Sequence, residues 1–157
     1  MNPAEAYDLA AVLPHRGDAL LLDAVTAVGQ RRLQASLTVR PGTVFSDALG
    51  DLPAWAGPEI MAQAVAAFSG HRSLRERGRP ASIGLLLGIR SFVSADAQFR
   101  CGETLLVDVV ESSEDEEGRA VFDGTITRDG AVVASGRLTV FQPPDDSFMQ
   151  RELARHV

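Results

Sequence analysis

A carboxylate stands at the start of an otherwise apolar stretch in the middle of the chain. Glu59 follows Gly57-Pro58 and precedes the largely apolar residues 60–68. Because this stretch is apolar nearly all round, it predicts a buried helix. Burying an ionised side chain is costly unless it is paired or hydrogen-bonded, so Glu59 is expected either at a polar opening or in its protonated form. Both environments suit a general acid or base.

Two other polar side chains could act with this carboxylate. Gln63 lies four residues after Glu59, on the same side of the predicted helix, and could orient the carboxylate. His15, in Leu13-Pro14-His15-Arg16, supplies an imidazole near the start of the first predicted strand, and a neutral imidazole near pH 7 fits a proton shuttle. The remaining histidines and the single cysteine lack the spacing of metal ligands, so no metal site is predicted.

The elements that must position these groups follow from hydrophobic periodicity. Strands are predicted at 20–28, 33–39, 82–93, 103–112, 119–128 and 131–142, with one helix at 58–76. Pro58 suits the first position of that helix, which stops before Gly78 and Pro80. Two strands, a helix and four strands indicate an α+β fold with an antiparallel sheet of about six strands wrapped round one central helix. A cystatin-like or other α+β roll would give a similar order.

Composition favours one domain over residues 1–157, with 143–157 as a loose extension or short helix. The chain has 157 residues, 45% of them hydrophobic, and a net charge of −6, which argues against general nucleic-acid binding. One cysteine excludes an intrachain disulfide and favours a reducing compartment. The acidic N-terminus does not resemble a signal peptide, and no apolar run approaches the roughly 20 residues of a membrane span. We therefore expect a cytoplasmic protein.

The strand predicted at 82–93 carries apolar side chains on both faces. Ile83, Leu85, Leu87 and Ile89 fall on one face, whereas Leu86 and Phe92 lie on the other. In a small domain, a strand that needs cover on both sides often marks a subunit contact.

Four segments, in the same order along the chain, resemble a known family. They are Leu13–Asp23, Leu52–Trp55, Glu59–Ala64 and Val140–Pro143. The first and third resemble motifs of the hot-dog 3-hydroxyacyl-[acyl-carrier-protein] dehydratases of fatty-acid synthesis. The other two are closer to the branch of that family found in aryl-polyene pigment clusters. The resemblance covers most of residues 8–142 and implies the hot-dog fold, in which a sheet curls round a central helix.

The resemblance also implies a reaction and its site residues. Such enzymes convert 3-hydroxyacyl thioesters into trans-2-enoyl thioesters, and Glu59 and His15 are the predicted acid and base, with their roles unassigned. Gly57 would let the thioester approach the helix N-terminus closely, Gln63 would orient the carboxylate, and Trp55 could line an acyl tunnel.

The substrate of this family is carried on the phosphopantetheine arm of an acidic acyl carrier protein. No further cofactor is therefore expected. Arginines that follow the central helix, Arg72, Arg75 and Arg79, are the predicted docking residues for the carrier, although such residues are more often a solvated helix end.

One departure from the family pattern opens alternative functions. The fatty-acid dehydratases carry a Gly-His-Phe-Pro-Gly segment whose histidine acts with the helix carboxylate of the neighbouring subunit, and this chain has Phe45 at that place. Losing a positioned acid or base typically costs about 10² to 10⁴ in rate. Either a substitute such as His15 or a partner subunit must compensate. The chain is therefore expected to be an active dehydratase in a homodimer, a catalytically weak partner in a heterodimer with another hot-dog subunit, or an acyl thioesterase.

Overall fold

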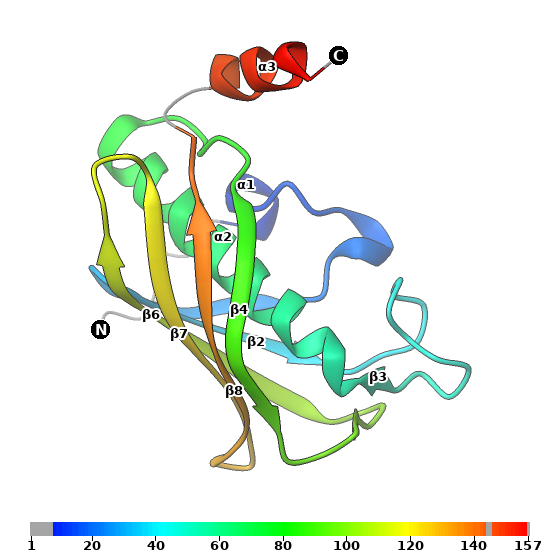
Figure 1. The fold of residues 1–157 in the computed structure, drawn as a ribbon. Coiled ribbons are helices and arrows are strands. Elements are labelled where there is room, and N and C mark those ends of the chain that lie inside the picture. Colours follow the sequence, from blue (N-terminus) through cyan, green and yellow to red (C-terminus); the bar gives the residue numbers. More distant parts are fainter. Residues whose placement is uncertain (1–7, 144–145, 157) are drawn as a thin grey trace.

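The computed structural model describes residues 8–143 and 146–156. A six-stranded antiparallel sheet, with the strand order β1-β2-β6-β7-β8-β4, curves around one long helix, α2 (Gly57–Arg77) (Figure 1). This arrangement confirms the α+β hot-dog fold predicted from the sequence. The strands of the large sheet are β1 (Ala24–Val28), β2 (Arg32–Thr38), β4 (Leu85–Ser94), β6 (Thr104–Glu114), β7 (Arg119–Arg128) and β8 (Ala131–Phe141).

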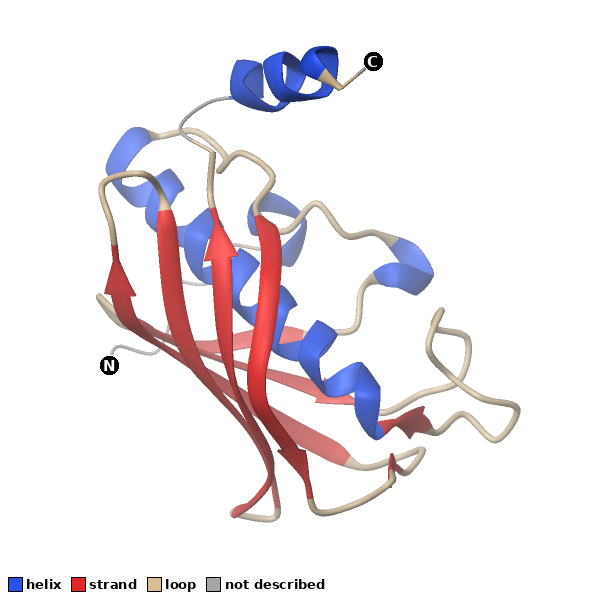
Figure 2. Cartoon of the chain, viewed as in Figure 1, coloured by secondary structure: helices blue, strands red, loops and turns tan. Residues whose placement is uncertain are grey.

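Several short elements complete the fold, and all of them except the last helix had no counterpart in the sequence prediction. Two-residue strands β3 (Leu52–Pro53) and β5 (Gln98–Phe99) pair with each other just before α2. The remaining elements are α1 (Leu9–Val12), the 3₁₀ turns η1 (Gly17–Ala19) and η2 (Ala54–Ala56), and α3 (Asp146–Arg155) (Figure 2). Helix α3 corresponds to the extension or short helix expected at 143–157, of which residues 144, 145 and 157 lie outside the described part.

The central helix is buried because the sheet covers its apolar side chains. Ile60, Met61 and Ala64 are fully buried, and the ring of Phe68 meets that of Phe122 edge to face at 5.6 Å between centroids. The helix begins with proline near its first position and ends at Gly78, whose φ of 67° lies in the left-handed region that favours glycine. The boundaries predicted from the sequence are therefore correct to within one residue.

The first strand is shorter than predicted, because side chains bind the backbone before it. The sequence predicted a strand over 20–28, but β1 begins at Ala24. The Leu21 N–H donates to the side chain of Gln63, and the Leu20 carbonyl accepts from Arg40. Since these backbone groups have side-chain partners, they do not join the ladder with β2.

Strand β4 lies at one edge of the sheet, where β8 is the one strand among the described residues that pairs with it. Its apolar side chains remain exposed on both faces: Leu85 is 37% exposed, Leu86 42% and Leu87 53%. An exposed apolar edge strand is a template for pairing with another chain. The cover expected for this strand is not supplied by the described residues of this chain, so the subunit contact stays a prediction.

Candidate active site

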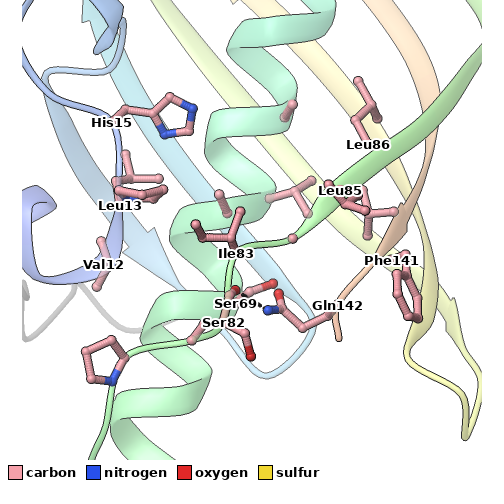
Figure 3. A pocket seen from close by; sticks show the side chains of 18 of the residues that line it. Val12, Leu13, His15, Ser69, Ser82, Ile83, Leu85, Leu86, Phe141 and Gln142 are labelled. Carbon is pink, nitrogen blue, oxygen red and sulfur yellow. Dashed lines mark hydrogen bonds between the residues drawn. The ribbon is translucent and has the colours of Figure 1, made fainter. Parts of the chain in front are cut away.

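One face of α2 forms a wall of an apolar cavity of about 460 Å³. Glu59, Ala62, Ala66 and Ser69 line it, and their spacing of three or four residues places them on one side of a helix. The opposite walls come from segments far apart in the sequence, which Figure 3 shows facing one another across the cavity. These segments are residues 10–16 before β1, residues 80–86 leading into β4, and residues 140–142 at the end of β8.

The predicted acid and base meet in the wall of this cavity. His15 Nε2 lies 3.5 Å from Glu59 Oε1, and the two side chains are 28% and 33% exposed. Glu59 therefore occupies a polar opening, one of the two environments expected for it. The other ring nitrogen of His15, Nδ1, is buried and has no hydrogen-bond partner among the described residues. The imidazole of His15 thus directs one nitrogen at the carboxylate of Glu59 and is only partly accessible to solvent.

Arg16 fastens the segment that carries this histidine. Its guanidinium donates to the carbonyls of Ala10 at 2.7 Å and His15 at 2.8 Å, and also to that of Leu13. Hydrogen bonds from a charged donor to three carbonyls fix an otherwise irregular loop. His15 is therefore placed by its neighbour rather than by regular secondary structure.

Gln63 is fully buried beneath the carboxylate, and both the nitrogen and the oxygen of its side-chain amide make hydrogen bonds. Its amide nitrogen donates to Glu59 Oε1 at 3.0 Å and to the Ala19 carbonyl at 2.9 Å, and its oxygen accepts from the Leu21 N–H at 2.9 Å. The side chain therefore links the carboxylate to the backbone before β1. This is the orienting position that the sequence predicted for it.

Two predicted substrate-binding residues lie away from the cavity. The Gly57 N–H donates to the Ala54 carbonyl, and a Cβ atom at Gly57 would come within 2.7 Å of the Phe92 ring. A ring, not an open space for a thioester, thus covers this glycine. Trp55 is 67% exposed and packs edge to face against Phe45 at 5.8 Å between centroids. It does not line the cavity described above.

The arginines predicted to dock the carrier, at the end of α2 and just after it, differ in whether acidic side chains pair with them. Arg72 pairs with Glu111 at 3.0 Å and with Glu114 at 3.1 Å. Burial opposes its charge, but the hydrogen bond to Glu111 and the nearby carboxylates outweigh burial and raise the pKa of Arg72. Arg75 and Arg79 are exposed. These two charges, unlike that of Arg72, face solvent.

The apolar walls were not predicted as a site from the sequence. Val12, Leu85, Leu86 and Phe141 line the cavity beside the helix. Phe141 belongs to a family-like motif, and the apolar residues before and in β4 were predicted to need cover on both faces of their strand. Neither signal indicated that these two segments would meet.

Within the described ranges, no group of three or more histidine, cysteine or acidic side chains could hold a metal ion, and no helix is long and apolar enough to span a membrane.

Chemically, the site combines proton transfer with binding of an apolar chain. A carboxylate and an imidazole in contact can divide the roles of accepting and donating a proton on one substrate. A largely apolar cavity with a few polar groups in its wall can hold and orient an elongated apolar ligand. The arrangement therefore suits acid–base chemistry near the polar end of a hydrocarbon chain.

Fold and site together define a hot-dog protein with a helix carboxylate facing an apolar cavity. A family model described as ApeP dehydratase matches residues 7–151. The chain belongs to this ApeP-like dehydratase family, which confirms the resemblance seen in the sequence motifs.

Solved structures agree with this assignment. The dehydratase heterocomplex ApeI:P from Xenorhabdus doucetiae includes a chain with a TM-score of 0.80 and 31% identity, covering 90% of this chain and 95% of that one. The TT0310 protein from Thermus thermophilus has a TM-score of 0.58 and 18% identity over 80% of this chain and 94% of its own. Zebra fish thioesterase superfamily member 2 has a TM-score of 0.55 and 16% identity over 76% of this chain and 80% of its own. The latter two share the fold alone. No curated protein sequence matches the chain.

Proposed function

We propose that the chain takes part in the dehydration of 3-hydroxyacyl thioesters on an acyl carrier protein to trans-2-enoyl thioesters, in polyene or fatty-acid-like biosynthesis. The observation that carries this proposal is the 3.5 Å contact between His15 and Glu59 in the wall of a largely apolar cavity. Membership of a dehydratase family supports the reaction class. The cavity would hold the acyl chain, with its thioester end near the pair.

The reaction needs two proton transfers on adjacent carbons. A base removes the C2 proton, the C3–O bond breaks, and an acid protonates the departing hydroxyl group so that it leaves as water. Glu59 and His15 would take these two roles between them, and Gln63 would hold the carboxylate in place. The substrate remains attached to its carrier throughout, so thioester hydrolysis is not part of the reaction.

We further propose that the working unit contains a second hot-dog subunit. The family histidine is replaced by Phe45, and a similar chain occurs in a structure named as a dehydratase heterocomplex. The exposed apolar residues of β4 offer an edge along which another sheet would pair. The second candidate function is a catalytically weak partner subunit, in which the other subunit, rather than His15, would supply the histidine that acts with Glu59.

Carrier docking would use the arginines whose charges face solvent. Arg75 and Arg79 are exposed, whereas Arg72 is engaged by two carboxylates. An acidic carrier would be attracted to the first two, with a dependence on salt. Arg75→Glu should weaken carrier binding at low salt and reduce its salt dependence, whereas unchanged binding would contradict this docking site.

Intact mass spectrometry of the carrier thioester tests the proposed reaction. The purified chain, alone and with a second hot-dog dehydratase subunit, would be incubated with a 3-hydroxyacyl carrier protein. Glu59→Gln and His15→Ala are the test variants, and the exposed residues Glu117→Gln and His156→Ala are matched controls. Loss of water that requires Glu59 and survives in the controls supports the proposal.

The same measurement separates the alternatives. Water loss only in the presence of the second subunit identifies the chain as a partner in a heterodimer. Release of free carrier thiol and free acid identifies a thioesterase. If folded protein converts none of the 3-hydroxyacyl substrate under either condition, the proposed dehydration is overturned.

A further inference from the structure

Strand β4 contains a bulge at a residue in an unfavourable conformation. The pairing of β4 with β8 shifts register between Arg90 and Val93, and Ser91 has a φ of 53°. A serine in the left-handed region stores strain that its surroundings must offset. Bulges turn a strand and redirect the side chain that follows. The side chain redirected here is Phe92.

The ring of Phe92 lies in a seat formed by two glycines from different elements. A Cβ atom at Gly57 would meet the ring at 2.7 Å and 2.9 Å, and one at Gly136 of β8 would meet it at 3.3 Å. Gly57 has helical angles, φ −54° and ψ −46°, in which alanine is more favourable than glycine. Its backbone therefore does not require glycine. Glycine is required at this position because the Phe92 ring occupies the space that a larger side chain would need.

This contact lies at the start of the helix that carries the carboxylate. Gly57 is the first residue of α2, and Glu59 follows two residues later. The N-cap residue, Ala56, has no side chain able to cap the helix, so no capping hydrogen bond secures the first turn. The Phe92 ring packed on Gly57 is an alternative support for this turn. The ring comes from the exposed edge strand.

We infer that Phe92 is a positioning residue that holds the first turn of α2, and with it Glu59, and that couples this turn to the edge strand β4. This inference rests on the proposed function, in which Glu59 acts on substrate and β4 meets the second subunit. Binding of that subunit along β4 would fix the bulge and the ring, and thereby the carboxylate. Phe92 itself does not line the cavity, so it acts through Glu59 rather than on the substrate.

A pair of complementary substitutions tests the contact. Phe92→Ala removes the ring, and Gly57→Ala drives a methyl group into it. Val132→Ala serves as the control, because it changes a side chain that is 59% exposed and lies on β8, outside the edge strand. In the complex with the second subunit, each test variant should lower kcat roughly 10- to 100-fold, because a displacement of about 1 Å of a reacting group can cost 10²-fold. KM should change little, since substrate binding in the cavity is retained.

Rescue and hydrogen exchange distinguish positioning from general damage. Combining Gly57→Ala with Phe92→Leu, a shorter side chain, should recover activity lost by Gly57→Ala alone. In the isolated chain, Phe92→Ala should speed amide exchange in residues 57–63 while leaving exchange in β6 and β7 unchanged. Exchange and kcat equal to those of Val132→Ala would overturn the inference.

The exchange measurement does not depend on turnover. If no variant and no wild-type complex dehydrates the substrate, the proposed function fails, whereas faster exchange confined to residues 57–63 still supports the role of Phe92 in holding this turn. If the complex is active but rescue is absent and exchange is unchanged, the inference fails and the proposed function stands.

Discussion

Replacing Gln63 with leucine removes the side chain that joins the carboxylate to the backbone before β1. The substitution deletes three hydrogen bonds and leaves the buried Leu21 N–H and the half-buried Ala19 carbonyl without their side-chain partner. Each buried group left unpaired costs about 1–3 kcal/mol. Because Ala19 is only half-buried, we expect the free energy of unfolding to fall by roughly 2–4 kcal/mol, a large share of the stability of a typical domain.

Chemical denaturation measures this loss, with Gln98→Leu as the control. Gln98 reaches Asp47 at only 3.5 Å in an exposed position, so its replacement should change the free energy of unfolding by less than about 0.5 kcal/mol. In buffer without denaturant, near neutral pH, Gln63→Leu should also lower kcat at least about tenfold, because Glu59 loses the donor that orients it. A Gln63→Leu protein as stable as the control would refute the argument from buried hydrogen bonds.

Three further outcomes follow from the structure. Burial, and then the charge of Arg75, lowers the pKa of His71, so below about pH 6.5 the unfolded chain binds a proton that the folded chain does not. The free energy of unfolding should therefore fall by up to about 1.4 kcal/mol for each unit by which the pH is lowered. Chemical denaturation at several pH values should show that this free energy depends less on pH in His71→Gln. Leu87→Asp places a charge on the exposed edge strand and should abolish association with the second subunit in sedimentation without unfolding the chain. Gly70→Ala would overlap the Val12 carbonyl, so it should lower the melting temperature by several degrees and displace the segment carrying the cavity wall; an unchanged melting curve would contradict this close packing of α1 on α2.

The sequence was sufficient for the elements whose periodicity is local. The helix over 57–77 and the long strands were predicted to within a few residues, because alternating or helical burial is written in adjacent side chains. The strand predicted over 20–28 was too long, since the competing partners of residues 20 and 21 come from Arg40 and Gln63. Those contacts link residues 20 and 42 positions apart, and no local pattern reports them.

The candidate site shows the same division. Glu59 and Gln63 could be related from the sequence because four residues make one helical turn. The contact between Glu59 and His15 crosses 44 positions of the sequence and became visible only when the loop fastened by Arg16 was folded against α2. Gly57 and Trp55 were predicted to bind substrate from their positions at the start of the helix and just before it, yet neither lines the cavity.

The sequence by itself determined the kinds of chemistry available: one carboxylate on an apolar helix, an amide one turn below it, an imidazole in an N-terminal motif, and a family resemblance that the comparisons confirmed. It also determined that β4 would carry apolar side chains on both faces. These properties depend on residue type and near-neighbour spacing.

Only the tertiary structure decided which of these groups work together. The order of the strands places β4 at an edge, where its apolar faces stay exposed, and the bulge at Ser91 directs Phe92 onto the glycine that opens the helix carrying Glu59. Packing of this kind depends on the space left between elements that are distant in the chain. A local pattern of side chains contains no measure of that space, whereas the folded chain fixes it through close packing.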